Sequence, residues 1–201
     1  TTLPKINTKD LRSYYDSKNY HSHKSSKSLL SMFYDVSSRF MVWRKVKLTS
    51  RFSKNKKSIL DFGCGRGGFL MSAKKAGFEV CGVDVITAAH KELEAKNIKV
   101  YNKIESLSNP VNTITFWHSL EHINDVNQTL MLCRKFLKDK GILIVAVPNH
   151  DSFDAKHYKS FWAAYDVPRH RFHFNKKGVL KTVQKHGFKH LLTKPMWLDS
   201  V

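Results

Sequence analysis

The fold class is decided by one stretch, Leu60-Asp61-Phe62-Gly63-Cys64-Gly65-Arg66-Gly67-Gly68-Phe69-Leu70. It begins in a short apolar run and ends in a helical pattern, so it links a strand to a helix. Glycine permits positive φ and lets a ligand approach the backbone closely. The first turn of the following helix offers unpaired amide donors to a negative group. The stretch therefore predicts a ligand-binding turn at the end of a strand.

A second acid, Asp84, lies 21 residues beyond Gly63, at the end of the next apolar run. In a doubly wound sheet this position can accept hydrogen bonds from both ribose hydroxyls of a nucleoside. Gly63, Gly65 and Gly68 also satisfy G-x-G-x-x-G, the fingerprint of dinucleotide sites. Asp61, however, suits a cofactor that carries an ammonium group better than it suits a pyrophosphate. This favours S-adenosylmethionine over NAD.

Outward from this stretch, short apolar runs alternate with helical patterns. Strands are expected over 59–62, 80–83, 98–101, 111–117 and 142–147, and a sixth over 188–197. Helices are expected near 67–76, 87–96, 126–138 and 176–186, the last between Asn175 and Gly187. The runs are continuously apolar, as in strands covered by helices on both faces. The pattern predicts a Rossmann-like, doubly wound, mostly parallel α/β sheet.

The chain divides at about residue 57. Residues 1–27 are polar and form an expected N-terminal arm, and apolar residues at three- and four-residue steps then predict an amphipathic helix over 29–48 with one buried face. A charged linker is expected over 51–57. Residues 58–201 form the predicted ligand-binding domain, with a lid insert near 151–175.

Composition excludes several classes of protein. None of the 201 residues belongs to an apolar stretch near the roughly 20 that a bilayer span needs. The three cysteines, Cys64, Cys81 and Cys133, have no CxxC spacing, which argues against a disulfide scaffold and fits a reducing compartment. No signal peptide is visible, so a cytoplasmic location is expected. The first residue is Thr1 rather than Met, so an earlier start of the native chain is an open alternative.

The net charge of +19 sits mainly in the flanks. Residues 1–57 hold 14 basic and 3 acidic residues, whereas residues 58–150 hold 11 and 9. Such a field attracts polyanions, among them nucleic acid, anionic lipid headgroups and phosphorylated substrates. A lysine-rich surface that keeps the protein in solution is the simpler interpretation, because no RNA-binding motif accompanies the charge.

Three further segments carry a family resemblance: Trp117-His118-Ser119-Leu120-Glu121-His122, then residues 141–149 ending in Pro148-Asn149, then residues 165–174 with Pro168-Arg169-His170. With the glycine stretch, they make residues 58–190 resemble the class I S-adenosylmethionine-dependent methyltransferases. The likeness is to the bacterial small-molecule type with an LEH segment, which includes the ubiquinone-biosynthesis enzymes.

The resemblance implies a set of cofactor contacts. The methionine end would meet the glycine turn, the ribose would meet the second acid, the adenine would lie beyond it, and the sulfonium would lie over the end of the fourth strand. In that order the residues are Asp61, Gly63, Cys64, Gly65 and Gly67, then Asp84, then Val85 and Glu105, then Trp117 and His118.

The chain departs from the family in two places. Asn112 stands where the fourth strand often begins with an acid. The family's seventh, antiparallel strand is missing before Val201, which would leave the fifth strand with an exposed apolar edge. The native protein is therefore expected to continue.

Methyl transfer needs the acceptor held about 3 Å from the methyl carbon, opposite the sulfur. A general base is needed only for a hydroxyl or acidic-carbon acceptor, and His122 and His170 are the catalytic candidates. Alternatively, His122 bonds a backbone carbonyl, and His170 and His173 anchor the lid. His118 and His122 also have the four-residue spacing of a metal pair, but without a third ligand no metal is expected. Arg169 and Arg171 could grip an anionic substrate.

The expected function is methyl transfer from S-adenosylmethionine to an O, N or C atom of a small-molecule or carrier-like acceptor. An RNA methyltransferase that uses the basic flanks, an inactive nucleoside-binding protein and an NAD oxidoreductase are the alternatives. The arm could fold over the cofactor through its aromatic and histidine residues, which are Tyr14, Tyr15, Tyr20, His21 and His23. The oligomeric state is not predicted.

Overall fold

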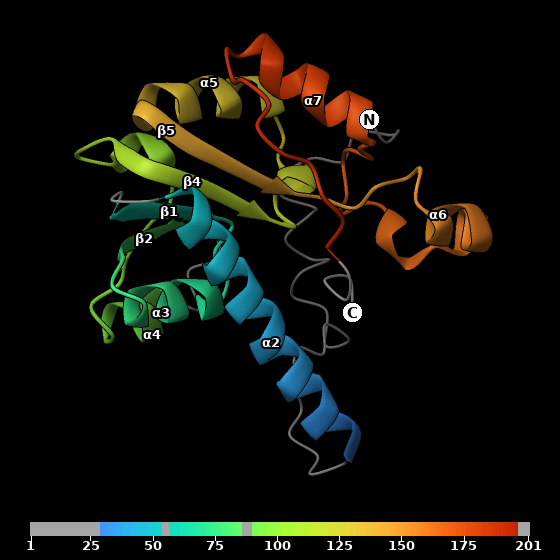
Figure 1. Ribbon diagram of the computed structural model, residues 1–201, viewed down its shortest axis with the longest axis horizontal. Helices are drawn as coiled ribbons and strands as arrows, with labels where there is room; N and C mark the ends of the chain where they lie inside the picture. The colour runs from blue at the N-terminus through green and yellow to red at the C-terminus, as the bar shows by residue number, and fades with distance from the viewer. Residues whose placement is uncertain (1–28, 54–56, 86–89, 197–201) are drawn as a thin grey trace.

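The computed structural model describes residues 29–53, 57–85 and 90–196. Five parallel strands form one sheet in the order β3-β2-β1-β4-β5 (Figure 1). The strands are β1 Ser58–Phe62, β2 Glu79–Val83, β3 Lys99–Tyr101, β4 Val111–Trp117 and β5 Leu137–Ala146. The sequence-based prediction of a Rossmann-like parallel sheet is confirmed.

Helices cover both faces of the sheet. They are α2 Leu29–Phe52, α3 Gly68–Lys75, α4 His90–Glu94, α5 Val126–Phe136, α6 Phe153–Tyr158 and α7 Lys176–Lys185. Figure 1 shows α5 and α7 on one side of the sheet and α2, α3 and α4 on the other. The predicted cap of α7 is confirmed, because Asn175 Oδ1 accepts a hydrogen bond from the Gly178 amide at 2.7 Å. Gly187, with φ of 79°, follows the helix as predicted.

The core has two halves, one on each face of the sheet. Ile59 packs with Leu70 and Leu93 from α3 and α4, whereas its neighbour Leu60 packs with Phe116 and Leu130 beneath α5. Successive residues of a strand point to opposite faces, so a strand buried on both faces must be apolar at every position. This is why the runs in the sequence do not alternate.

The order of the strands places the ligand site. The chain moves outward from β1 through β2 to β3, and then crosses back to place β4 on the other side of β1. The connections that leave β1 and β4 therefore diverge, and a crevice opens beyond the carboxyl ends of these two strands.

One predicted boundary is wrong. The helix expected over 126–138 ends at Phe136, and β5 begins at Leu137 rather than at residue 142. Leu137 pairs with Val111, and the register shifts before Thr113 pairs with Ile142. Lys140, with φ of 56°, lies in this irregular stretch. The polar sequence 138–140 continues the helical pattern of α5, and only pairing with β4 makes it a strand.

The predicted sixth strand is also wrong as far as residues 188–196 are concerned, because they form neither helix nor strand. Leu191 and Leu192 are exposed, at 66% and 48%. A strand forms only where a ladder partner completes its hydrogen bonds, and the described residues place none beyond β5. In the described sheet, β5 is therefore an edge strand, as β3 is at the opposite side.

Helix α2 extends four residues beyond the predicted helix and takes in the start of the predicted linker. Its C-terminal end joins the sheet, where the hydroxyls of Ser53 and Thr113 lie 2.7 Å apart. Among the described side chains of this helix, burial is confined to its C-terminal half: Met41 and Thr49 are buried, whereas the apolar residues Phe40 and Trp43 are about half exposed. Figure 1 shows the reason, because α2 runs out from the body of the domain. The N-terminal arm lies outside the described residues.

No described helix is both long enough and apolar enough to cross a bilayer.

Candidate functional site

The turn after β1 depends on its glycines. Gly63, Gly65 and Gly67 have φ of 74°, 50° and 73°, in the left-handed region that side chains rarely adopt. A Cβ on Gly63 would lie 2.5 Å from the Cβ of Ser119, and one on Gly67 would lie 2.3 Å from Leu93 Cδ2. The turn is thus packed directly against the segment that follows β4 and against α4, at the crevice that the topology predicts.

Asp61 is a buried acid at the end of β1. The residue is 4% exposed, and its Oδ1 accepts a hydrogen bond from Thr115 Oγ1 at 2.7 Å. Burial raises the pKa of this carboxyl to about 7, although the Thr115 bond and the charge of Lys45 oppose the rise. A cation placed beside Asp61 would favour its ionised form.

Asp84 connects the end of β2 to the glycine turn. Its Oδ2 accepts a hydrogen bond from the Gly65 amide at 2.7 Å, and its own amide donates to the Tyr101 carbonyl at 3.0 Å. Val85, the next residue, is 72% exposed. Glu105 is exposed in a short 3-10 turn after β3, next to the buried Ile104. The predicted ribose and adenine residues therefore share one edge of the sheet.

The chain turns sharply where β4 ends. Trp117 packs edge-on against Phe69 of α3, with 5.5 Å between ring centroids, and Lys45 Nζ of α2 lies 5.3 Å from the Trp117 ring centroid. His118 has φ of 54°, which is uncommon for a residue with a side chain. Ser119 Oγ then donates to the Phe62 carbonyl. These contacts hold the next residues, the 3-10 turn η3 Leu120–His122, against the glycine turn.

The insert that follows β5 folds back onto η3. The amides of Arg171 and Phe172 both donate to the Glu121 carbonyl, at 2.8 and 3.2 Å. Arg169 donates through two nitrogens to Asp166 Oδ1, at 2.9 and 2.6 Å. Nε2 of His173 lies 2.9 Å from the Tyr165 carbonyl, so this histidine anchors the insert. Arg169, which the sequence offered as a residue that binds an anionic substrate, thus binds the carboxylate of Asp166 in this structure.

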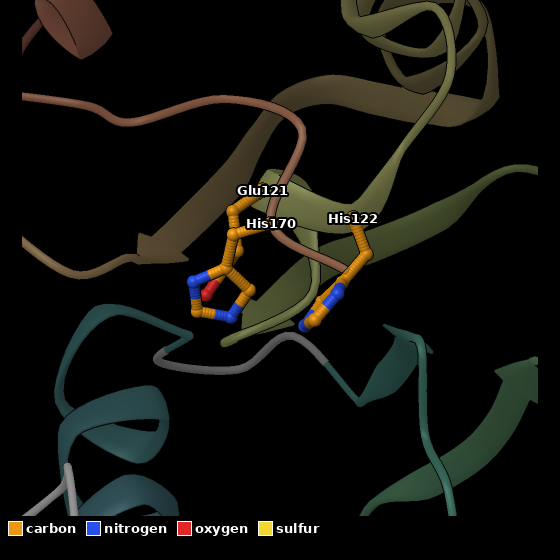
Figure 2. A group of neighbouring side chains, drawn as sticks. All are labelled: Glu121, His122 and His170. Carbon is orange, nitrogen blue, oxygen red and sulfur yellow. The ribbon is translucent and has the colours of Figure 1, made fainter. Parts of the chain in front are cut away.

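The fold brings together Glu121 and the two histidines predicted as catalytic residues, His122 and His170 (Figure 2). The His122 and His170 rings lie edge to face, with centroids 4.6 Å apart. Burial, assisted by the charge of His170, lowers the pKa of His122 to about 4, and burial also lowers the pKa of His170. Nδ1 of His122 lies 3.1 Å from the Arg169 carbonyl, so the backbone contact considered for this residue is also present.

Glu121 is the residue that sequence reasoning missed. It is 1% exposed, and within the described part of the chain neither carboxylate oxygen has a hydrogen-bond partner. His118 lies beside it, with Nδ1 at 3.8 Å from Glu121 Oε1. Burial raises the pKa of Glu121 to about 7. The sequence showed an acid inside the LEH segment, but it did not show that the acid would be buried alone.

Comparison with known proteins adds a family and a fold. The family model described as a methyltransferase domain matches residues 36–193. An uncharacterized protein of Methanocaldococcus jannaschii is 30% identical over 149 residues, which are 72% of this chain and 63% of that protein. A ubiquinone biosynthesis O-methyltransferase of Actinobacillus pleuropneumoniae is 29% identical over 108 residues, 46% of each. The chain thus spans less than two thirds of the length of these curated relatives.

Solved structures share the fold. A magnesium protoporphyrin IX methyltransferase from Synechocystis with bound SAH matches with a TM-score of 0.67 and 14% identity, over 90% of both chains. A SAM-dependent methyltransferase from Archaeoglobus fulgidus matches with a TM-score of 0.63 and 23% identity, over 81% of this chain and 75% of that one. At these identities the likeness shows the fold alone.

Proposed function

The chain belongs to the methyltransferase domain family, and from that premise we propose that it transfers the methyl group of S-adenosylmethionine to a small-molecule acceptor. The resemblance seen in the sequence is confirmed at the level of the family. The observation that carries the proposal is the junction of the glycine turn with Asp84, made by the 2.7 Å bond from the Gly65 amide, beside the buried Asp61.

We place the cofactor along the carboxyl ends of β1 and β2. The ammonium group of the methionine end would lie by Asp61, and its carboxylate would meet the amides of the glycine turn, which runs from Gly63 through Cys64 and Gly65 to Gly67. A carboxylate has two oxygens and about four acceptor sites, so Asp84 can hold both the Gly65 amide and the ribose. The adenine would then lie toward Val85 and Glu105.

The acceptor is assigned to the other side of the crevice, beyond the end of β4. Trp117 and His118 end that strand, and η3 follows them against the glycine turn. We propose that His122 and His170 face the acceptor, because η3 and the insert bring them together on that side. The protein's main task would be to hold the acceptor atom about 3 Å from the methyl carbon in line with sulfur.

The relatives named ubiquinone biosynthesis O-methyltransferase support a small acceptor and an oxygen nucleophile. A carrier-bound or anionic acceptor would fit the same assignment. The RNA methyltransferase alternative has one observation in its favour, the excess of basic residues in the two flanks.

Cofactor identity is tested by isothermal titration calorimetry of the full chain with S-adenosylmethionine, S-adenosylhomocysteine and NAD. We expect the first two to bind at micromolar concentrations and NAD not to bind. Binding of NAD alone would contradict the proposal and support the oxidoreductase alternative.

Acceptor class is tested with a radiolabelled methyl donor, incubated separately with a metabolite extract and with total RNA. We expect label in small molecules and none in RNA. Label in RNA would support the RNA alternative, and tight cofactor binding with no transfer to either pool would support an inactive nucleoside-binding protein.

A further inference from the structure

We propose that Glu121, His122 and His170 form a binding site for a divalent transition-metal ion. The three residues lie next to one another although His170 is 48 positions beyond His122 in the sequence. One ligand atom from each lies within 4.8 Å of the others. The site adds to the proposed function, and the binding of the ion is measured without the cofactor or the acceptor.

The first argument is the unsatisfied carboxylate of Glu121. The residue is 1% exposed, and no described group donates a hydrogen bond to either oxygen. A buried charge without a partner costs several kcal/mol, and a protonated acid there would still lack a partner for its hydroxyl and its carbonyl oxygen. A bound cation would satisfy both oxygens, which no described neighbour does.

The second argument is the orientation of the two histidines. Nδ1 of His122 lies 3.1 Å from the Arg169 carbonyl oxygen, and Nδ1 of His170 lies 2.7 Å from the Ala164 carbonyl oxygen. A carbonyl oxygen can only accept, so each Nδ1 carries the proton. In a neutral imidazole the lone pair is then on Nε2, the nitrogen able to bind a metal. Backbone carbonyls commonly fix metal-binding histidines in this way.

The third argument is the charge around the cluster. Asp166 Oδ2 lies 3.8 Å from Nε2 of His170, too far for a hydrogen bond but close enough to add negative potential. The Arg169 guanidinium on the same loop is held by Asp166 Oδ1, at 2.6 Å. His118 lies 3.8 Å from Glu121 Oε1. None of these described groups donates a hydrogen bond to the Glu121 carboxylate.

The donor set indicates the kind of ion. Two imidazole nitrogens and one carboxylate suit Zn²⁺, Fe²⁺, Co²⁺ or Mn²⁺ better than Mg²⁺ or Ca²⁺, which prefer oxygen ligands. Bonds of about 2 Å set atoms that share one ion roughly 3–4 Å apart, so the cluster would tighten on binding. Three protein ligands leave coordination positions open. If the proposed function holds, an acceptor oxygen could occupy one of them.

The pairing of His118 with His122, which the sequence suggested and set aside, is not the pair that the fold assembles. Residues 120–122 form a 3-10 turn, and His118 lies before it with a left-handed backbone, so the two rings do not share a helix face. The third ligand that the sequence lacked is supplied by the insert, through His170.

The test uses the full chain, stripped with a chelator and titrated with Co²⁺ and with Zn²⁺. Calorimetry gives the stoichiometry, and Co²⁺ visible absorption reports the ligand field. We expect one ion per chain, and at least a tenfold loss of affinity in Glu121→Gln, His122→Ala and His170→Ala. The control is His186→Ala, because His186 bonds Asn127 on α5 and is remote from the cluster in the sequence. It should bind the ion as the unmodified protein does.

The proposal is overturned if the unmodified protein binds no ion stoichiometrically, or if Glu121→Gln binds it equally well. Glu121→Gln keeps the shape of the side chain, so it remains informative where a histidine variant fails to fold. Binding of S-adenosylhomocysteine to each variant is measured in parallel. Loss of ion binding with cofactor binding retained separates this proposal from the proposed function.

Discussion

Two buried acids at the ends of neighbouring strands show how the two halves of the crevice differ. Burial raises the pKa of both Asp61 and Glu121 to about 7. Asp61 accepts a hydrogen bond from Thr115, whereas Glu121 accepts none from any described group. On the β1 side, the hydrogen bond from Thr115 offsets part of the cost of burying the acid, whereas on the β4 side no described group donates a hydrogen bond to the acid.

The surroundings of the two acids differ in the same way. On the β1 side, backbone bonds and glycine contacts fix the turn to β2, to the segment that follows β4, and to α4. On the β4 side, the histidines come from η3 and from a long insert. The described residues thus give Asp61 one side-chain hydrogen-bond donor, whereas they give the Glu121 carboxylate none.

The largest expected effect is on stability, at the contact between Gly63 and Ser119 that joins the two halves. Gly63→Ala should lower the free energy of unfolding by about 3 kcal/mol, because it combines a left-handed backbone with overpacking against Ser119. Gly65→Ala is the matched control, because it has positive φ but no atom within 4 Å of the added Cβ. It should cost about 1 kcal/mol. Urea unfolding measures both, and equal costs would remove the Ser119 contact from the argument.

The next effect is on cofactor affinity, which should depend on Asp84 but not on Glu121. Asp84→Ala should weaken S-adenosylhomocysteine binding roughly 10- to 100-fold, because hydrogen bonds to a charged acceptor contribute about 1.5–3 kcal/mol. Glu121→Gln should leave that affinity nearly unchanged. Calorimetry compares the two variants. A similar loss in both would show that the division into a cofactor half and an acceptor half is wrong.

The third effect is the pH dependence of cofactor binding. The ammonium group of the cofactor needs Asp61 ionised, so affinity for S-adenosylhomocysteine should fall about tenfold per pH unit below about 7. Asp61→Asn should bind weakly at all pH values and lose this dependence. An unchanged pH profile in Asp61→Asn would assign the titration to another group.

The raised pKa of Asp61 also predicts how the stability of the ligand-free protein changes with pH. The pKa of Asp61 is about 7 in the folded protein, against an ordinary value of 3.8 in an unfolded chain, so between these pH values the folded state binds the proton more strongly. Stability should therefore fall as the pH rises from about 4 to about 7 and should be flat above that range. The slope should be smaller in Asp61→Asn.

The smallest effect compares the two acids directly. Glu121→Gln should raise the stability of the metal-free protein at pH 8 by about 1 kcal/mol, because an amide is cheaper to bury than a lone carboxylate. Asp61→Asn should raise it at least as much, because burial displaces the pKa of Asp61 further from its ordinary value even with the Thr115 bond in place. Thermal melting in the presence of a chelator measures both. Destabilisation by Glu121→Gln would show that Glu121 has a partner.

Local pattern was enough to predict the sheet, the glycine turn and the positions of Asp61 and Asp84. It failed where contacts between distant segments determine the secondary structure. Residues 138–140 form a strand only because they lie against β4, and residues 188–196 have no ladder partner among the described strands. The exposure of Trp43 depends on how far α2 runs beyond the body of the domain.

The site was predictable to the same degree. The LEH segment and the Pro168-Arg169-His170 segment were both singled out, but their contact is a tertiary event set by the amides of Arg171 and Phe172 on the Glu121 carbonyl. No motif could predict that the described residues would leave the Glu121 carboxylate without a hydrogen-bond donor, because this depends on how the chain packs.

The close approach of Gly63 and Ser119 has a mechanical consequence. Because no side chain separates them, the glycine turn cannot shift toward the segment after β4 without displacing Ser119. We therefore expect a ligand that displaces the glycine turn to displace the start of η3 as well.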